Sequence, residues 1–208
     1  MLLRILIIIA AGYLLGNLNG AILISRFLSH DDVRNHGSGN AGLTNYFRNY
    51  GGFNSLLVIG IDAAKGVAAC LLGRFLLAPY GLSQEGTALA AVAVGLGHDF
   101  PALLGFKGGK GILCGFASSF VLDWRVALVT FAVFAIVYLL TKYVSLCSVL
   151  GAVTLGTSYA IWHWNQPWAV AGCSAMCLLA IFQHRENIKR LLSGTETKTD
   201  FFKKGKKA

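Results

Sequence analysis

The sequence predicts an all-α protein, a polytopic transmembrane helix bundle of about seven spans that forms a single domain over residues 1–208. Three observations predict this class. The chain is 55% hydrophobic and only 13% charged, about half the charged fraction of a soluble domain. Apolar runs long enough to cross a bilayer recur along it, and basic residues cluster in alternate connecting segments. The composition therefore argues against a soluble protein.

Seven apolar windows are candidate spans: residues 3–25, 52–73, 86–104, 111–123, 125–141, 145–162 and 167–184. The first is too long for the core of a signal peptide and lacks an Ala-x-Ala cleavage site, so we expect a retained helix. The fourth is short and rich in glycine, which leaves open whether it crosses the bilayer fully.

The basic residues predict the orientation. Fourteen of the 18 lysines and arginines fall in residues 26–50, 105–110, 142–144 and 185–208. The other side of the predicted membrane holds only Arg4, Arg74 and Arg125. Cytoplasmic loops carry the excess of positive charge in membrane proteins, so we expect the N-terminus outside and the C-terminus in the cytoplasm.

Three polar segments fall on the predicted cytoplasmic side. The first, "GSGNAGLTNYFRNYG" (residues 37–51), offers an anion five donor side chains: Ser38, Asn40, Thr44, Asn45 and Arg48. The second is "GHDFPALLGFKGGKGI" (residues 97–112). The third, "HRENIKRLLSGTE" (residues 184–196), places His184 and Asn187 one helical turn apart. Together they predict an anion site at one membrane face.

The glycine-rich stretch within the second segment differs from a nucleotide-binding P-loop. That loop needs a glycine where Leu104 stands and Ser or Thr where Gly111 stands. We expect instead a turn in which the N–H groups of Gly108, Gly109, Lys110 and Gly111 converge on an anion at a helix N-terminus. A flexible turn whose lysines extend toward the headgroups explains the stretch equally well.

In this order the three segments resemble the signatures of the bacterial acyl-phosphate-dependent glycerol-3-phosphate acyltransferases, an integral membrane family. The matching patterns are Gly-Ser-Gly-Asn-x-Gly-x-Thr-Asn-x-x-Arg, Gly-His-x-Phe-Pro followed by Phe-Lys-Gly-Gly-Lys-Gly, and His-x-x-Asn-Ile-x-Arg-Leu-x-x-Gly-Thr-Glu. They extend over residues 37–196, most of the chain. The departures are small: Leu43 stands where alanine is usual, and Cys114 where threonine is common.

The resemblance implies transfer of a fatty acyl group from acyl phosphate to the 1-hydroxyl of sn-glycerol 3-phosphate, which yields lysophosphatidate and phosphate. It implies that Ser38 and the backbone of Gly108–Gly111 hold the acyl phosphate. Arg48, Lys110, His184 and Asn187 are then expected to hold glycerol 3-phosphate, with Thr44 and Asn45 in support. It also places the protein in the bacterial inner membrane with its active site on the cytoplasmic side.

The expected partners are these two substrates and membrane lipid, with no nucleic acid and no obligatory protein partner. We expect no cofactor and no metal, because no His or carboxylate pair near the loops has ligand spacing. A transporter or anion channel is the main alternative, although the sequence has no internal repeat and its donors cluster at one face. A non-catalytic phospholipid-binding scaffold is the second.

Several residue roles stay open. Ser38 is favoured as a phosphate ligand over a nucleophile, because the sequence places no base beside it. The proton acceptor is either His184 or a substrate phosphate.

Other polar residues have structural interpretations beside functional ones. Asp62 and Lys65 are expected to form a buried ion pair. His98 and Asp99 are expected to fix the following loop. Ser145 and Ser148 either add donors or pack helices. His163 lies in the outer aromatic belt "WHWNQPW" (residues 162–168) and is expected not to be catalytic.

Overall fold

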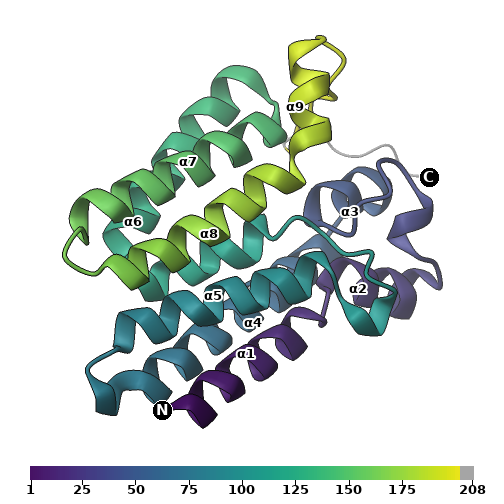
Figure 1. Ribbon diagram of the computed structural model, residues 1–208. Helices are drawn as coiled ribbons and strands as arrows, with labels where there is room; N and C mark the ends of the chain where they lie inside the picture. Colours follow the sequence, from purple (N-terminus) through teal and green to yellow (C-terminus); the bar gives the residue numbers. More distant parts are fainter. Residues whose placement is uncertain (202–208) are drawn as a thin grey trace.

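The computed structural model describes residues 1–201, which contain helices and their connections and no strand (Figure 1). The α-helices are α1 (Leu2–Gly16), α2 (Gly20–Ser29), α3 (Leu43–Tyr50), α4 (Asn54–Leu77), α5 (Ser83–Asp99), α6 (Ile112–Thr141), α7 (Val144–Trp162), α8 (Pro167–Gln183) and α9 (Arg185–Leu192). Three 3-10 helices, Val33–Asn35, Ala78–Tyr80 and Ala102–Leu104, lie in the connections. The predicted all-α class is confirmed.

The helix ends follow from local sequence. Asn19 begins α2 by accepting a hydrogen bond from the Ile22 N–H at 3.1 Å, which satisfies a donor that the helix itself leaves free. The predicted window 3–25 is therefore two helices with a break at residues 17–19. Pro167 is the first residue of α8, where its missing N–H breaks no helical hydrogen bond.

Five segments are long and apolar enough to cross a membrane: Leu2–Ser29, Asn54–Tyr80, Ser83–Leu104, Ile112–Thr141 and Val144–Trp162. A sixth is the pair α8 and α9, which is bent by 54°. The predicted windows 111–123 and 125–141 both lie within α6, so this criterion does not confirm seven spans. The orientation of the termini also stays a prediction, and the lysines after residue 201 that support it lie outside the described residues.

Helix α6 nevertheless reverses direction at Asp123, whose φ of −158° and ψ of 113° are not helical. The rings of Phe116 and Phe131 lie only 6.0 Å apart, whereas fifteen residues of straight helix would separate them by about 22 Å. Residues 112–122 and 124–141 are therefore two arms packed against each other. Arg125 and His163 bind the Asp123 carboxylate at the turn, at 2.6 and 2.9 Å. The first arm is about 16 Å long, well short of a bilayer core of about 30 Å.

Close helix packing surrounds the predicted ion pair. A Cβ on Gly97 of α5 would lie 2.9 Å from the Cα of Gly16 of α1, so these helices approach nearly to backbone contact. Between α1, α4 and α5, the buried Lys65 Nζ lies 2.7 Å from the Asp62 carboxylate and donates to the Leu18 carbonyl at 2.8 Å. The predicted buried ion pair is confirmed.

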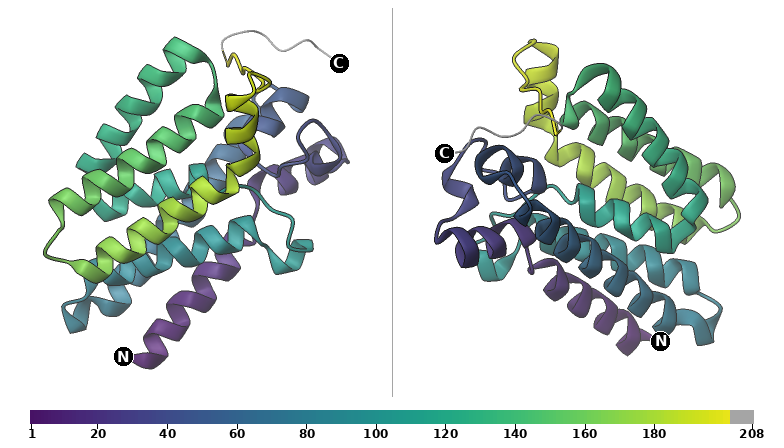
Figure 2. Two further views of the ribbon diagram at one scale, coloured as in Figure 1. Left: turned by 45° about the horizontal axis from the view of Figure 1, so that its top comes forward. Right: turned by 180° about the vertical axis from the view of Figure 1, so that it is seen from behind.

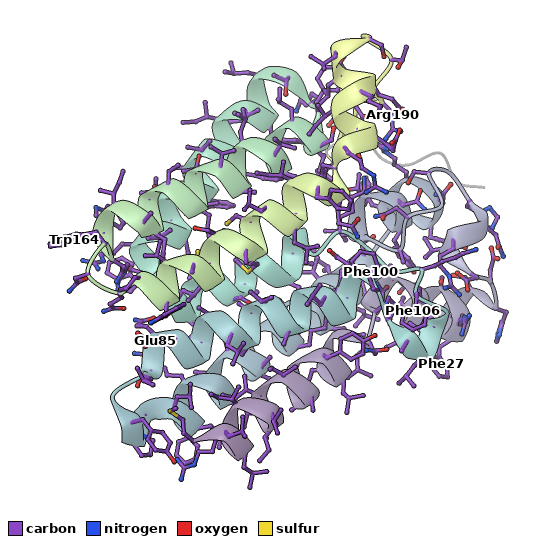
Figure 3. The ribbon with its side chains drawn as sticks, in the orientation of Figure 1. Phe27, Glu85, Phe100, Phe106, Trp164 and Arg190 are labelled. Atoms are coloured by element: carbon purple, nitrogen blue, oxygen red, sulfur yellow. The ribbon has the colours of Figure 1, made fainter. Side chains whose placement is uncertain are left out.

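The polar connections gather at one end of the bundle. Figure 2 shows α3, α9 and the loop before α6 at the end away from the N-terminus. In Figure 3, Phe100, Phe106 and Arg190 lie at this end, while Glu85 and Trp164 lie at the other. We call the first the loop end of the bundle. The three polar segments of the sequence therefore meet at one place.

Candidate active site

One cavity of about 1150 Å³ begins among the connections of the loop end and extends between the helices. Every residue assigned to the site from the sequence lines it: Ser38, Asn40, Thr44, Asn45, Arg48, Gly108, Gly109, Lys110, Gly111, Ser145, His184 and Asn187. They come from α3 and the loop before it, the loop before α6, the start of α7, and the junction of α8 and α9. The structure thus brings together all three polar segments.

The glycine turn is built differently from the sequence-based expectation. The N–H of Gly108 donates to the Asp99 carbonyl at 3.1 Å, and that of Gly109 to the His98 carbonyl at 3.0 Å. The prediction that four N–H groups converge on an anion is therefore wrong for these two. Among the described residues, the N–H groups of Lys110 and Gly111 have no hydrogen-bond acceptor. The N–H groups of the turn that remain available to an anion are therefore those of its second half.

The first two polar segments are joined directly at this turn. The Ala41 N–H donates to the Gly108 carbonyl at 3.2 Å, and Asn19 Nδ2 donates to the Ala41 carbonyl at 2.9 Å. Gly109 packs against the ring of His98, where a Cβ would lie only 2.9 Å from Cδ2. Only glycine fits this contact, and His98 fixes the loop, as expected from the sequence.

Asn45 organises the loop that carries Ser38. Its Nδ2 donates to the carbonyls of Val33 and His36, each at 3.0 Å, and its Oδ1 accepts the Ser38 N–H at 3.0 Å. Both amide donors are therefore used inside the protein, and Asn45 positions other groups instead of offering a free donor. The hydroxyl of Ser38 has no hydrogen-bonded base among the described residues, which favours a phosphate ligand over a nucleophile.

A network around Glu196 connects the third segment to the glycine turn. Lys110 donates to Asn187 Oδ1, and Asn187 Nδ2 donates to Glu196 Oε1 at 2.9 Å. The same carboxylate accepts from Ser145 at 2.9 Å and from Arg190 at 2.7 Å. The sequence analysis missed Glu196 and Arg190 as site residues. Both residues belong to the third sequence motif, and that membership could have identified them as site residues.

The segment after α9 also holds Arg48. Its Nε donates to Thr199 Oγ1 and its Nη2 to the Thr197 carbonyl, both at 2.7 Å. Residue 199 is tied in turn to the α6–α7 connection, because its N–H donates to the Lys142 carbonyl at 2.9 Å. Residues 194–201 therefore form a strap across the loop end, and we use that name below.

The electrostatics of this end favour an anion. The pKa of Lys110 is lowered to about 8, mainly by burial and also by the nearby positive charges of Arg190, Arg185 and Arg48, while Glu196 opposes the shift. One carboxylate thus stands among several cations. A doubly charged phosphate would offset this excess of positive charge and stabilise the protonated form of Lys110.

His184 has a defined tautomer. Its Nδ1 lies 2.7 Å from the Ala180 carbonyl, which can only accept, so Nδ1 carries the proton. In the neutral ring Nε2 is then an acceptor. The ring is buried and lines the cavity, so Nε2 is suited to receive a proton or, when charged, to bind phosphate.

Beyond the polar end the cavity becomes apolar. Its walls there come from α5, both arms of α6, α7 and α8, and are lined by Gly95, Leu113, Gly115, Phe116, Thr130, Phe131, Phe134, Ser148, Gly151, Ala152, Leu155, Met176, Cys177, Leu179 and Ala180. We call this part the slot. His163 lies outside it, bonded to Asp123 at the opposite end of the bundle.

Fold and cavity together define an integral membrane protein with a basic site that continues into an apolar slot between helices. The sequence model of the family described as "Glycerol-3-phosphate acyltransferase" matches residues 6–194. The chain belongs to this family.

Similar proteins cover nearly the whole chain. A "Glycerol-3-phosphate acyltransferase" from Thermoanaerobacter sp. (strain X514) is 41% identical over 186 residues, 89% of this chain and 91% of the relative. One of the same name from Neisseria meningitidis serogroup B is 36% identical and covers 91% of this chain and 94% of its own length. The crystal structure of PlsY (YgiH), an integral membrane glycerol 3-phosphate acyltransferase in its glycerol 3-phosphate form, matches with a TM-score of 0.85. It is 31% identical and covers 94% of this chain and 96% of its own.

Proposed function

We propose that this protein transfers a fatty acyl group from acyl phosphate to the 1-hydroxyl of sn-glycerol 3-phosphate, which gives 1-acyl-glycerol 3-phosphate and inorganic phosphate. The product is the first acylated intermediate of phospholipid synthesis. One observation carries the proposal: donors from all three polar segments line a single cavity that continues into an apolar slot. A water-soluble phosphate and a lipidic phosphate can meet there.

Two sets of donors, which overlap at Lys110, hold the two anions. Arg48, Lys110, His184 and Asn187 bind the phosphate of glycerol 3-phosphate, and Thr44 and Asn40 line the same end. The strap uses the Nε donor and one Nη2 donor of Arg48, so the Nη1 hydrogens and the remaining Nη2 hydrogen are the ones that we assign to phosphate. The acyl phosphate is bound by Ser38 and by the N–H groups of Lys110 and Gly111, which have no acceptor in the described part of the chain. Lys110 belongs to both sets, so its charge reduces the repulsion between the anions.

The chemistry needs no covalent enzyme intermediate. The 1-hydroxyl oxygen attacks the acyl carbon, and the new ester bond forms as the bond from that carbon to the phosphate oxygen breaks. The phosphate leaves with the electron pair, and Lys110 stabilises the charge that develops on it. The hydroxyl proton passes to Nε2 of His184 or to an oxygen of a substrate phosphate; both acceptors are available in this arrangement.

The apolar slot accounts for the rest of the donor. Its walls exclude water from the acyl chain, and burying hydrocarbon there stabilises the complex by about 0.8 kcal/mol per methylene. The basic residues at the loop end support a site on the cytoplasmic side of a bacterial inner membrane, because cytoplasmic loops carry the excess of positive charge. The soluble substrate then enters from the cytoplasm, while the lipidic one enters with its chain in the bilayer.

The deciding experiment measures phosphate release and lysophosphatidate formation by the purified protein with acyl phosphate, with and without glycerol 3-phosphate, in the presence of a chelator. We expect both products only when glycerol 3-phosphate is added. A transporter or a lipid-binding scaffold would form no lysophosphatidate. Turnover with acyl-CoA as sole donor would reject acyl phosphate as the substrate, and loss of activity in chelator would reject the metal-free mechanism.

A further inference from the structure

The slot is widened at three positions by glycine. Gly95 of α5, Gly115 of α6 and Gly151 of α7 all line the cavity. Glycine lowers the stability of a helix interior relative to alanine. Its presence in a helix therefore needs a reason, either close packing against a neighbour or space for something else.

Close packing does not account for Gly151. A Cβ there would lie 3.7 Å from Thr130 Cγ2 and 4.0 Å from Phe134 Cδ2, which is ordinary van der Waals contact. At Gly97, in contrast, a Cβ would lie 2.9 Å from backbone of the neighbouring helix, so packing alone demands glycine. A methyl group at position 151 would therefore fit without a clash, and it would narrow the slot.

The wall opposite Gly151 carries an unpaired polar group. Thr130 is 5% exposed, lines the cavity, and its Oγ1 has no hydrogen-bond partner among the described residues. A buried hydroxyl without a partner is uncommon in a packed helix interface. Thr130 and Phe134, the residues that a Cβ at position 151 would contact, line the same cavity as Gly151, so a side chain at position 151 would extend into the part of the slot between α6 and α7.

Gly151 lies part of the way down the slot. Along α7 the lining residues run from Ser145, which contacts Glu196, to Leu155 in the buried core. At 1.5 Å per residue, Gly151 lies about 9 Å and Leu155 about 15 Å beyond Ser145. A short acyl chain therefore ends before Gly151, whereas a long one must pass it.

We propose that Gly151 determines which acyl chains the enzyme accepts: because it has no side chain, a long chain passes Thr130 and Phe134 and reaches Leu155. This inference rests on the proposed function, since it assigns the slot to the acyl group of the donor. It predicts that filling position 151 selects against long donors while short donors are used relatively better.

The experiment compares hexadecanoyl and hexanoyl phosphate as donors for the wild type, Gly151→Ala and Gly151→Leu. Gly156→Ala is the matched control. Gly156 lies on the same helix but does not line the cavity, and a Cβ there meets only Cys177, at 3.5 Å. We expect the ratio of kcat/KM for the long donor over the short one to fall about tenfold or more in Gly151→Leu. Gly151→Ala should change it less, and Gly156→Ala should leave it unchanged.

The ratio separates specificity from folding. A folding defect lowers the rate with both donors equally and leaves the ratio at the wild-type value, which would overturn the inference. An equal shift in Gly156→Ala would overturn it too, because that residue is outside the slot. If the wild type forms no lysophosphatidate from either donor, the proposed function fails instead. An active wild type with an unchanged ratio in the Gly151 variants rejects only the role of Gly151.

Discussion

The side chain of Lys110 lies where the groups expected to bind the two phosphates meet. Its ammonium group donates to Asn187, and the backbone N–H groups of Lys110 and Gly111 have no acceptor within residues 1–201. Lys107, three residues earlier, is exposed and does not line the cavity. The two lysines of the glycine-rich stretch are therefore expected to differ in function, although the sequence presents them alike.

We predict that Lys110→Ala lowers kcat about 100-fold with both substrates saturating, because its charge stabilises the leaving phosphate in the transition state. Lys107→Ala should change kcat less than about twofold, since an exposed lysine outside the cavity contacts neither phosphate. Steady-state kinetics on purified variants of matched thermal stability provide the measurement. Near-normal turnover by Lys110→Ala, together with loss in Lys107→Ala, would contradict the assignment.

The lowered pKa of Lys110 predicts a pH dependence. Below a pH of about 8 the free enzyme carries the positive charge at Lys110, and above it the charge is lost. The phosphate of the acceptor stays a dianion throughout this range, with its second pKa near 6. We therefore expect kcat/KM for glycerol 3-phosphate to fall as the pH rises through about 8, since this constant reports the free enzyme.

Lys110→Arg is the control for this titration. Arginine keeps its charge well above pH 9, so the fall should disappear from the accessible range even if the absolute rate is lower. A wild-type profile that stays flat up to pH 9.5, or the same decline in Lys110→Arg, would show that another group titrates.

At the scale of elements, hydropathy identified which segments are helical but not how the chain reverses direction between them. The boundary between the windows 111–123 and 125–141 coincides with Asp123, because one carboxylate interrupts an otherwise apolar stretch. At this reversal Asp123 pairs with Arg125 and is hydrogen-bonded to His163. The partners of Asp123 are set by tertiary packing, with His163 forty residues away. No local pattern contains that information.

Which residues line the candidate site could be predicted from the sequence, but how they hydrogen-bond to one another could be predicted less well. The three polar segments could be found because donor residues are sparse in so apolar a chain. Which donors are free could not be predicted, because the donors of Gly108, Gly109 and Asn45 bind carbonyls nine to twelve residues earlier in the chain, and the folding of the loops decides these pairings. Glu196 was missed because a lone carboxylate in a phosphate site looks unfavourable until its three hydrogen-bond donors, Ser145, Asn187 and Arg190, are seen around it.

For the whole molecule, the open question is which face of the membrane carries the loop end. The basic asymmetry predicts the cytoplasm. Ser193 follows α9 and is exposed at that end. Ser193→Cys, in a background without the five native cysteines, should be labelled by an impermeant thiol reagent only after the cells are opened. Labelling in intact cells would place the site on the outer face and contradict both the topology and access by a cytoplasmic substrate.

The strap affects the order in which the site is assembled during synthesis of the protein. Glu196, Thr197 and Thr199 follow every span in sequence, so the ribosome adds them after the last hydrophobic segment has been made. A nascent chain can have all its helices in the bilayer and still lack the carboxylate that gathers Ser145, Asn187 and Arg190. Membrane insertion and catalytic competence are therefore successive events, and an unfinished chain held at the translocon has no assembled site.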